Sequence, residues 1–354
     1  MANRKQMMSR KILHVCNLDK FIPPFINFLE DHFSFKDHFL WLNGDHEKFP
    51  IRSCLASYEV ELGAAGKFKG MLKLIQLMQV SEKIILHGLF NREIVLILFF
   101  MPSLLKKCYW VMWGGDLYAY RLREKNWKRK SQEYFRRHVI KNVGYLVCYV
   151  EGDYELAKEW YGVRGQWIKC FFYPSNLYQN VNLHQRQDND VNILVGNSAD
   201  PRNKHSEIFD KLEKFKDQSL KIYAPLSYGD PAYANAIVKE GKMRFGEKFL
   251  PITEFIEFNQ YLEFLGCIDI AIFNHDRQQG MGTIRTLLGL GKKVFMPMGI
   301  TSVEALKCDG IKVFSISEIN LDPNFDEKTN NEILVREIYS EKNLISCLSK
   351  IWNS

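Results

Sequence analysis

Short apolar runs alternate with longer helical patterns along the first half of the chain. The runs are rich in Ile, Val and aromatic residues, and they predict buried strands at residues 12–16, 39–42, 84–87, 108–113, 145–150 and 168–173. Between them, residues 91–105 and 153–161 have the apolar spacing of helices. This alternation predicts a parallel sheet with helices on both faces.

A polar, amide-rich segment at residues 178–190 interrupts the alternation and predicts an interdomain linker. Beyond it, strands are predicted at 191–195, 220–224, 268–273, 293–295 and 311–314, and helices at 204–216, 231–240, 253–265 and 283–290. The fold class is therefore α/β, with two doubly wound, Rossmann-like domains at residues 1–178 and 191–330. We expect a ligand cleft between the two domains. A closing C-terminal helix is predicted within residues 331–354.

The composition indicates a globular protein. The 354 residues are 46% hydrophobic and 25% charged, which excludes disordered, collagen-like and coiled-coil chains. The first residues lack the apolar core of a signal peptide, and the apolar run at 94–101 is shorter than the roughly 20 residues that cross a bilayer. The eight cysteines include no C-x-x-C pair, so we expect a reduced cytosolic chain without a zinc site.

Positive charge is concentrated at residues 106–141, which carry a net charge of +8, compared with +7 for the whole chain. The same segment contains several aromatic residues. Basic and aromatic residues together are typical of a surface for single-stranded nucleic acid or for an anionic membrane, and a solvated helix face is a third interpretation. The candidate surface residues are Arg121, Arg123, Lys128, Arg129, Lys130, Arg136 and Arg137.

The first informative loop follows the predicted strand at 191–195. Gly196 lets the backbone approach a ligand, and Asn197 and Ser198 supply hydrogen-bond donors before a helix begins. The same residue types are common in ordinary turns. A phosphate-binding loop and a plain turn both remain open for this segment.

A second loop joins the predicted strand at 268–273 to an apolar helix. It contains Arg277, Gln278, Gln279, Gly280, Gly282 and Thr283. The glycines expose backbone N–H groups and Arg277 adds a positive charge, which favours a site that holds a diphosphate and stabilises it as a leaving group. The loop is neither a Walker motif nor a G-x-G-x-x-G fingerprint.

Two polar residues follow strands in the first half. His87 ends one predicted strand, and Asp116 comes after a Gly-Gly pair that follows another. An acid and an imidazole at strand ends would act as general base and orienting partner. The structural alternatives are a hydrogen-bonded core histidine and an aspartate that fixes the Gly-Gly turn.

Together these motifs resemble one family. The segments LHGLFN at 86–91, WGGDLY at 113–118, ILVGNSAD at 193–200 and RQQGMGT at 277–283 resemble, in order and spacing, the bacterial 4-alpha-L-fucosyltransferases of glycosyltransferase family 56. That family transfers N-acetylfucosamine from dTDP to lipid II in the synthesis of enterobacterial common antigen. The resemblance extends from about residue 80 to 300.

The resemblance implies the GT-B architecture, with two Rossmann-like domains facing across a cleft, the acceptor on the N-terminal domain and the donor nucleotide on the C-terminal domain. It also implies catalysis without a metal or other cofactor, because a helix N-terminus and side chains replace the cation at the diphosphate. Asp116 and His87 are then the expected catalytic residues, and the two loops of the second half form the donor site.

The partners implied are a nucleotide sugar, a polyprenyl-diphosphate-linked saccharide and an anionic membrane surface, rather than nucleic acid. The expected location is peripheral, at the cytoplasmic face of the bacterial inner membrane. An alternative is a GT-B transferase that uses another nucleotide sugar and another acceptor for capsule or lipopolysaccharide.

Overall fold

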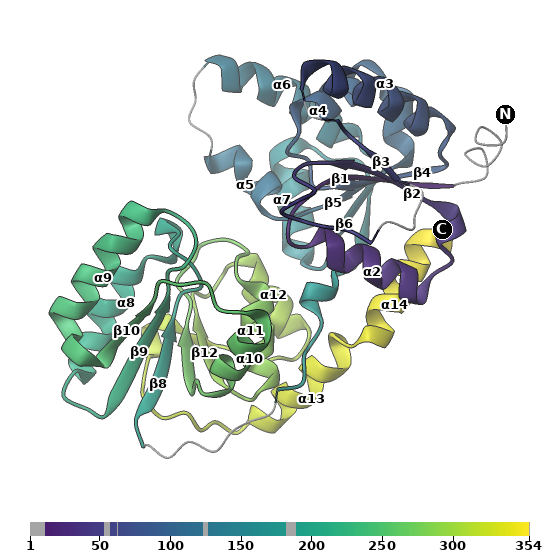
Figure 1. Ribbon diagram of the computed structural model, residues 1–354. Coiled ribbons are helices and arrows are strands. Elements are labelled where there is room, and N and C mark those ends of the chain that lie inside the picture. The colour runs from purple at the N-terminus through teal and green to yellow at the C-terminus, as the bar shows by residue number, and fades with distance from the viewer. Residues whose placement is uncertain (1–10, 53–56, 62, 123–126, 182–188, 354) are drawn as a thin grey trace. The chain divides into compact units, whose positions relative to one another are not determined.

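The computed structural model describes residues 11–52, 57–61, 63–122, 127–181 and 189–353 (Figure 1). The chain divides into two compact units, one formed by residues 1–175 with 341–354 and the other by residues 176–340. Each unit contains one sheet, and the strand pairs among the described residues are parallel. This confirms the predicted pair of Rossmann-like α/β sheets.

The first unit has a seven-stranded sheet of order β3-β2-β1-β4-β5-β6-β7. Its strands are β1 (Ile12–Asn17), β2 (His38–Asn43), β3 (Ser57–Glu59), β4 (Lys83–His87), β5 (Cys108–Val111), β6 (Tyr145–Cys148) and β7 (Gln166–Lys169). Its helices are α2 (Ile22–His32), α3 (Ala64–Val80), α4 (Arg92–Phe100), α5 (Gly115–Leu122), α6 (Trp127–Asn142), α7 (Glu151–Tyr161) and α14 (Glu341–Asn353).

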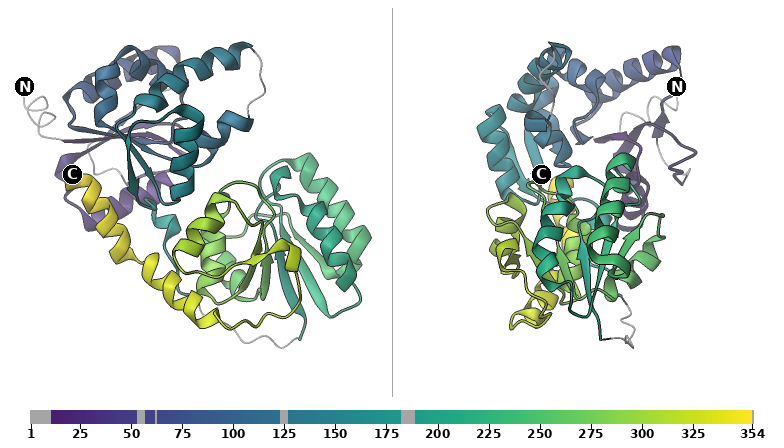
Figure 2. Two further views of the ribbon diagram at one scale, coloured as in Figure 1. Left: turned by 180° about the vertical axis from the view of Figure 1, so that it is seen from behind. Right: turned by 90° about the vertical axis from the view of Figure 1, so that its left-hand side faces the viewer.

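The two faces of this sheet are covered by different helices because side chains alternate along each strand. Leu13 and Val15 of β1 pack into a core formed with α3, α4, α6 and α7. His14 points to the opposite face, where its ring contacts Phe25 of α2 and Trp352 of α14. Helices α2 and α14 lie side by side there in both views (Figures 1 and 2).

Helix α14 is fixed to the sheet by Lys83 at the start of β4. The Lys83 ammonium donates to the carbonyls of Ile351 and Trp352 at 2.9 and 2.8 Å. These carbonyls belong to the last turn of the helix, where a cation is favourable. The lysine therefore joins the C-terminal end of the chain to the centre of the first sheet.

The second unit has a six-stranded sheet of order β10-β9-β8-β11-β12-β13. Its strands are β8 (Val191–Val195), β9 (Leu220–Pro225), β10 (Phe249–Ile252), β11 (Ile270–Ile272), β12 (Lys293–Met296) and β13 (Phe314–Ser315). Its helices are α8 (His205–Leu212), α9 (Pro231–Phe245), α10 (Phe258–Gly266), α11 (Met281–Gly289), α12 (Thr301–Cys308) and α13 (Lys328–Ile338). Helices α8 and α9 pack on one face, and α10, α11 and α12 cover the other (Figure 1).

The structure differs from the sequence prediction at the edges of the sheets and in the C-terminal helices. Strands β3 and β10 were not predicted, because both are edge strands, the first polar and the second containing Pro251. Two helices, α13 and α14, replace the single closing helix expected within 331–354, and they belong to different units. Residues 182–188 of the predicted linker lie outside the described residues. No helix within the described ranges is long and apolar enough to cross a bilayer.

Candidate active site

The two polar loops of the second unit lie together at the carboxyl ends of neighbouring strands, β8 and β11. The side chain of Asn197 connects them. Its amide oxygen accepts from Gln279 Nε2 at 3.3 Å, and its amide nitrogen donates to the Tyr228 hydroxyl at 3.2 Å. The structure therefore brings together residues that are about 80 positions apart in the sequence.

The turn after β8 depends on Gly196 and Asn203. Gly196 has φ +68°, and a Cβ at this position would lie 2.6 Å from Nε2 of the buried His205. The fully buried Asn203 accepts from the Asn197 N–H and donates to the Ser198 carbonyl at 3.2 and 3.1 Å. Asn203 thus fixes the conformation of this loop through hydrogen bonds to its backbone.

Gly280 forms the N-cap of α11, with φ +64° and no side-chain cap on the first turn. A Cβ at Gly280 would lie only 3.0 Å from Cγ of Asn197, so the absence of a side chain permits the close approach of the two loops. Gly282 and Thr283 follow in the first turn, and the Thr283 hydroxyl lies 3.3 Å from the Tyr261 hydroxyl. The N-terminus of α11 points its backbone N–H groups toward the carboxyl edge of the sheet.

Arg277 stands beside this helix N-terminus. Its guanidinium Nη2 lies 3.7 Å from the Asp200 carboxylate, which Arg202 also binds at 2.6 Å. These hydrogen bonds to Arg202 outweigh burial and lower the pKa of Asp200. Gln278 is half-buried in the same loop. All the donor-site candidates therefore belong to two adjacent loops of one unit.

In the first unit, Asp116 is buried at the start of α5 and is enclosed by N–H donors. One carboxylate oxygen accepts from Trp110 Nε1 at 2.7 Å and from the Leu89 N–H at 3.1 Å. The other oxygen accepts from the backbone N–H groups of Trp113 and Leu117, both at 3.0 Å. Burial raises the pKa of the Asp116 carboxyl against these hydrogen bonds.

His87 belongs to a buried row of histidines that crosses three neighbouring strands. Its Nε2 lies 3.0 Å from Nδ1 of His14, whose Nε2 lies 2.9 Å from Nδ1 of His38. The other nitrogen of His87 lies 2.7 Å from the Tyr173 hydroxyl, to which Trp113 Nε1 donates at 2.9 Å. Burial lowers the pKa of His87 to about 3, so the ring is neutral at physiological pH.

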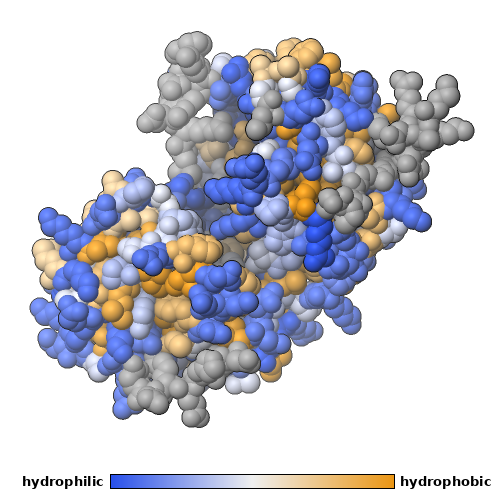
Figure 3. All heavy atoms as spheres, viewed as in Figure 1, coloured by the Kyte–Doolittle hydropathy of each residue, from blue (hydrophilic) through white to orange (hydrophobic). Residues whose placement is uncertain are grey.

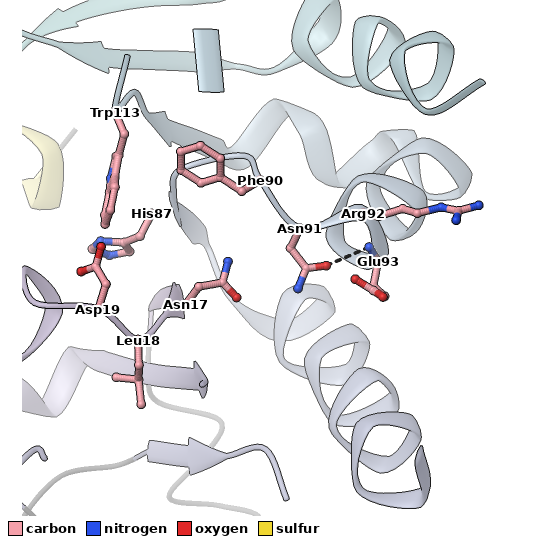
Figure 4. Close-up of a pocket in the computed structure, with 9 residues that line it drawn as sticks. All are labelled: Asn17, Leu18, Asp19, His87, Phe90, Asn91, Arg92, Glu93 and Trp113. Atoms are coloured by element: carbon pink, nitrogen blue, oxygen red, sulfur yellow. Dashed lines mark hydrogen bonds between the residues drawn. The ribbon is translucent and has the colours of Figure 1, made fainter. Parts of the chain in front are cut away.

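A pocket of about 560 Å³ opens at the same edge of the first sheet. It is lined by residues from the loops after β1, β4 and β5, shown in Figure 4: Asn17, Leu18, Asp19, His87, Phe90, Asn91, Arg92, Glu93 and Trp113. The Phe90 ring is seated against Gly88, where a Cβ would lie 2.6 Å from it. Asp116 is not among the lining residues, and Asp19 was not singled out in the sequence.

The basic residues of 106–141 have different environments. Arg136 is buried, so its prediction as a membrane-facing residue is wrong; it donates to Tyr161 Oη at 2.6 Å and to the carbonyl of Asp116. Lys130 and Arg137 are exposed on α6. Arg123 lies outside the described residues, as do the side chains of Arg121, Lys128 and Arg129.

No three His, Cys, Asp or Glu side chains within the described part of the chain gather in a way that could hold a metal ion.

Solved structures of glycosyltransferases are similar to this chain over nearly its whole length. HepE of Anabaena, solved in complex with UDP and glucose, matches with a TM-score of 0.65 and 11% identity over 97% of this chain and 98% of that chain. Sucrose-phosphate synthase of Thermosynechococcus elongatus matches with a TM-score of 0.65 and 9% identity over 97% and 98%. A glycosyltransferase of Rickettsia africae matches with a TM-score of 0.62 and 12% identity over 98% of each chain.

These likenesses show the GT-B fold. The model of the 4-alpha-L-fucosyltransferase family, glycosyltransferase group 56, matches residues 71–321, which include the loops around His87, Asp116, Asn197 and Gly280. The chain therefore belongs to the 4-alpha-L-fucosyltransferase family, and it is a glycosyltransferase with the GT-B fold.

Proposed function

We propose that this glycosyltransferase moves N-acetylfucosamine, a 4-acetamido-4,6-dideoxyhexose, from dTDP to a polyprenyl-diphosphate-linked saccharide in bacterial surface polysaccharide synthesis of the enterobacterial common antigen type. The family membership supports a fucose-like donor sugar. The acceptor chemistry comes from the resemblance of the loop motifs to that family.

The main observation in support of the proposal is the arrangement of the two loops that follow β8 and β11 in the second unit. A helix N-terminus without a side-chain cap, an arginine beside it and a glycine that admits close approach are the features that bind a diphosphate. In this proposal, Arg277 and the first turn of α11 stabilise the leaving diphosphate in place of a metal ion. Asn197, Ser198 and Gln279 fix the nucleotide.

Asp116 and His87 take positioning roles in this mechanism. Each Asp116 oxygen already accepts two N–H groups, and each His87 nitrogen already has a partner. A general base needs a free lone pair within reach of the acceptor hydroxyl. We therefore propose that Asp116 fixes the loop from Trp113 to Leu117, and that His87 and Tyr173 orient Trp113.

A nucleotide-binding experiment tests the donor. Titration calorimetry with dTDP, UDP, GDP and NAD should give the tightest binding for dTDP, and Arg277→Ala should weaken it by tenfold or more because a charge-assisted contact is lost. Arg244→Ala is the matched control, since Arg244 pairs with acidic residues on the outside of α8 and α9. Binding of NAD alone, or unchanged dTDP affinity in Arg277→Ala, would refute the donor site.

We also propose peripheral binding to the anionic cytoplasmic face of the inner membrane. Exposed aromatic side chains lie on α3 (Phe68), at the end of α4 (Phe100) and on α6 (Tyr134). Figure 3 shows apolar spheres beside hydrophilic ones over this part of the first unit. Phe100 and Tyr134 are 73% and 67% exposed and both contact the Phe99 ring, and Lys130 lies on the same helix as Tyr134. Such a surface suits an anionic lipid headgroup layer.

Sedimentation with vesicles tests this surface. The full chain should bind phosphatidylglycerol vesicles at low salt, bind pure phosphatidylcholine weakly, and be released at about 0.5 M salt, where charge attraction is screened. The double variant Lys130→Glu with Tyr134→Ser should lose most of the binding. Lys239→Glu, an exposed change on α9 of the second unit, should not. Equal binding by the double variant and by wild type would contradict the assignment.

A further inference from the structure

The pocket of the first unit has the lining of a carbohydrate site. Two aromatic rings, Phe90 and Trp113, stand 6.0 Å apart at 77° and form part of its wall. Two amides, Asn17 and Asn91, and the charged groups around them supply hydrogen-bonding partners (Figure 4). A pocket of about 560 Å³ with apolar walls and a few polar groups fits one or two sugar rings.

Asp19 is the half-buried carboxylate of this pocket, next to Trp113 and His87 in Figure 4. One of its oxygens, Oδ1, accepts the backbone N–H of Phe21 at 2.8 Å, which fixes the side chain just before α2. Burial raises the pKa of the Asp19 carboxyl against this hydrogen bond and those from the start of the helix. A carboxylate that is held in place and partly desolvated has the properties of a general base.

The other groups of the pocket are less suited to this role. Both nitrogens of His87 have partners inside the fold. Glu93 is exposed to solvent in the first turn of α4. Asp116 does not line the pocket. Among the acidic and imidazole groups considered, Asp19 is thus the one whose position in the pocket and whose environment both suit a general base.

We propose that the pocket binds the terminal sugar of the acceptor and that Asp19 is the general base of the transfer. The acceptor hydroxyl gives its proton to the Asp19 carboxylate while its oxygen forms the bond to the anomeric carbon of the donor. The bond from that carbon to the diphosphate oxygen breaks, and its electron pair leaves with the diphosphate. This assignment rests on the proposed function, because it requires transfer to a saccharide hydroxyl.

The decisive variant is Asp19→Asn, because its amide oxygen can still accept from the Phe21 N–H while basicity is lost. Its matched control is Asp45→Asn: Asp45 follows β2, accepts the N–H of Glu47 at 3.0 Å in the same way, and is exposed outside the pocket. Steady-state transfer is measured with dTDP-N-acetylfucosamine and a short-chain polyprenyl-diphosphate disaccharide. Melting temperature and dTDP affinity are measured for each variant.

We expect Asp19→Asn to lower kcat by about 10²- to 10⁴-fold with little change in KM, melting temperature or dTDP affinity. Asp45→Asn should behave as wild type. Glu93→Gln should raise the acceptor KM and leave kcat within a few-fold. If Asp19→Asn lowers the melting temperature, Asp19→Ser, whose hydroxyl can also accept from Phe21, replaces it.

A kcat for Asp19→Asn within fivefold of wild type would refute the assignment of Asp19 as the general base. A loss of kcat in Glu93→Gln alone would assign that role to Glu93 instead. Transfer assays with dTDP-, UDP- and GDP-sugars distinguish a failure of this assignment from a failure of the proposed function. Transfer from UDP- or GDP-sugars but not from dTDP-sugars would refute the donor alone, and the same comparison of variants would then be made with the active donor.

Discussion

The buried histidine row predicts that acid destabilises the first unit. His14 and His87 are both buried, and burial lowers the pKa of each below its usual value of 6.5, that of His87 to about 3. In the unfolded chain the same imidazoles bind protons once the pH falls below about 6.5. Between these two values the unfolded state therefore binds more protons than the folded state, and the free energy of unfolding falls as the pH falls.

The size of the effect follows from the pKa of His87. Each pH unit between about 6.5 and 3 removes up to about 1.4 kcal/mol, so His87 alone should cost about 3 kcal/mol at pH 4.5 and about 4 kcal/mol near pH 3. Domains are commonly stable by about 5–15 kcal/mol, so this loss is large. The carboxyls of Asp19 and Asp116 act in the opposite sense, because burial raises their pKa values and acid then favours the folded state.

A variant isolates the contribution of His87. His87→Gln keeps a side chain that can contact His14 and does not titrate. Between pH 7.5 and pH 4.5 the variant should therefore lose about 3 kcal/mol less stability than wild type. The seven tryptophans of the chain all lie in the first unit, so tryptophan fluorescence during urea unfolding reports that unit alone. If the free energies of unfolding of His87→Gln and wild type differ by the same amount at pH 7.5 and at pH 4.5, the interpretation of His87 as a neutral, buried group is refuted.

Three further predictions concern groups that hold the loops and helices in place. Lys83→Met should cost about 1.5–3 kcal/mol and raise hydrogen exchange in α14, because two charge-assisted bonds to its last carbonyls are lost. Arg136→Lys should lower stability by about 2–3 kcal/mol through its contact with Tyr161, yet leave vesicle binding unchanged because the side chain is buried. Gly280→Ala should weaken dTDP binding at least tenfold in calorimetry, since a left-handed φ costs about 1–2 kcal/mol and the new Cβ meets Asn197; unchanged affinity would refute the close approach of the loops.

The sequence predicts the centre of each sheet better than its edges. Strand β8 was predicted at its observed bounds, and β1 and β4 to within one residue, because their apolar runs are buried on both faces. Strands β3 and β10 have one neighbour each, so polar residues and a proline are tolerated there. Strand β3 (Ser57–Glu59) therefore has no apolar run in the sequence, and the apolar run of β10 (Phe249–Ile252) is interrupted by Pro251.

The family resemblance implied that the loops after β8 and β11 form one donor site. The structure shows why they lie together: β8 and β11 are adjacent parallel strands, and such strands end at one edge of the sheet. Sequence patterns could not show that Asn203 and His205 support the turn from beneath. They also could not show that Arg136 is buried, since a run of basic residues gives no sign of which one turns inward.

Asp116 and Asp19 differ in the hydrogen bonds that their carboxyl oxygens accept. Asp116 is conspicuous in the sequence because it follows two glycines, yet glycines of this kind mark a tight turn, and a buried turn needs an acceptor for its N–H groups. The Asp116 carboxylate meets that need with both oxygens. Asp19 stands in a short loop without glycine, one oxygen held by Phe21 and the side chain lining a pocket. Under the proposed mechanism the second arrangement suits proton transfer, because a general base must keep a lone pair for the substrate proton. The available signal was positional: Asp19 follows β1, the strand that pairs with the one ending at His87.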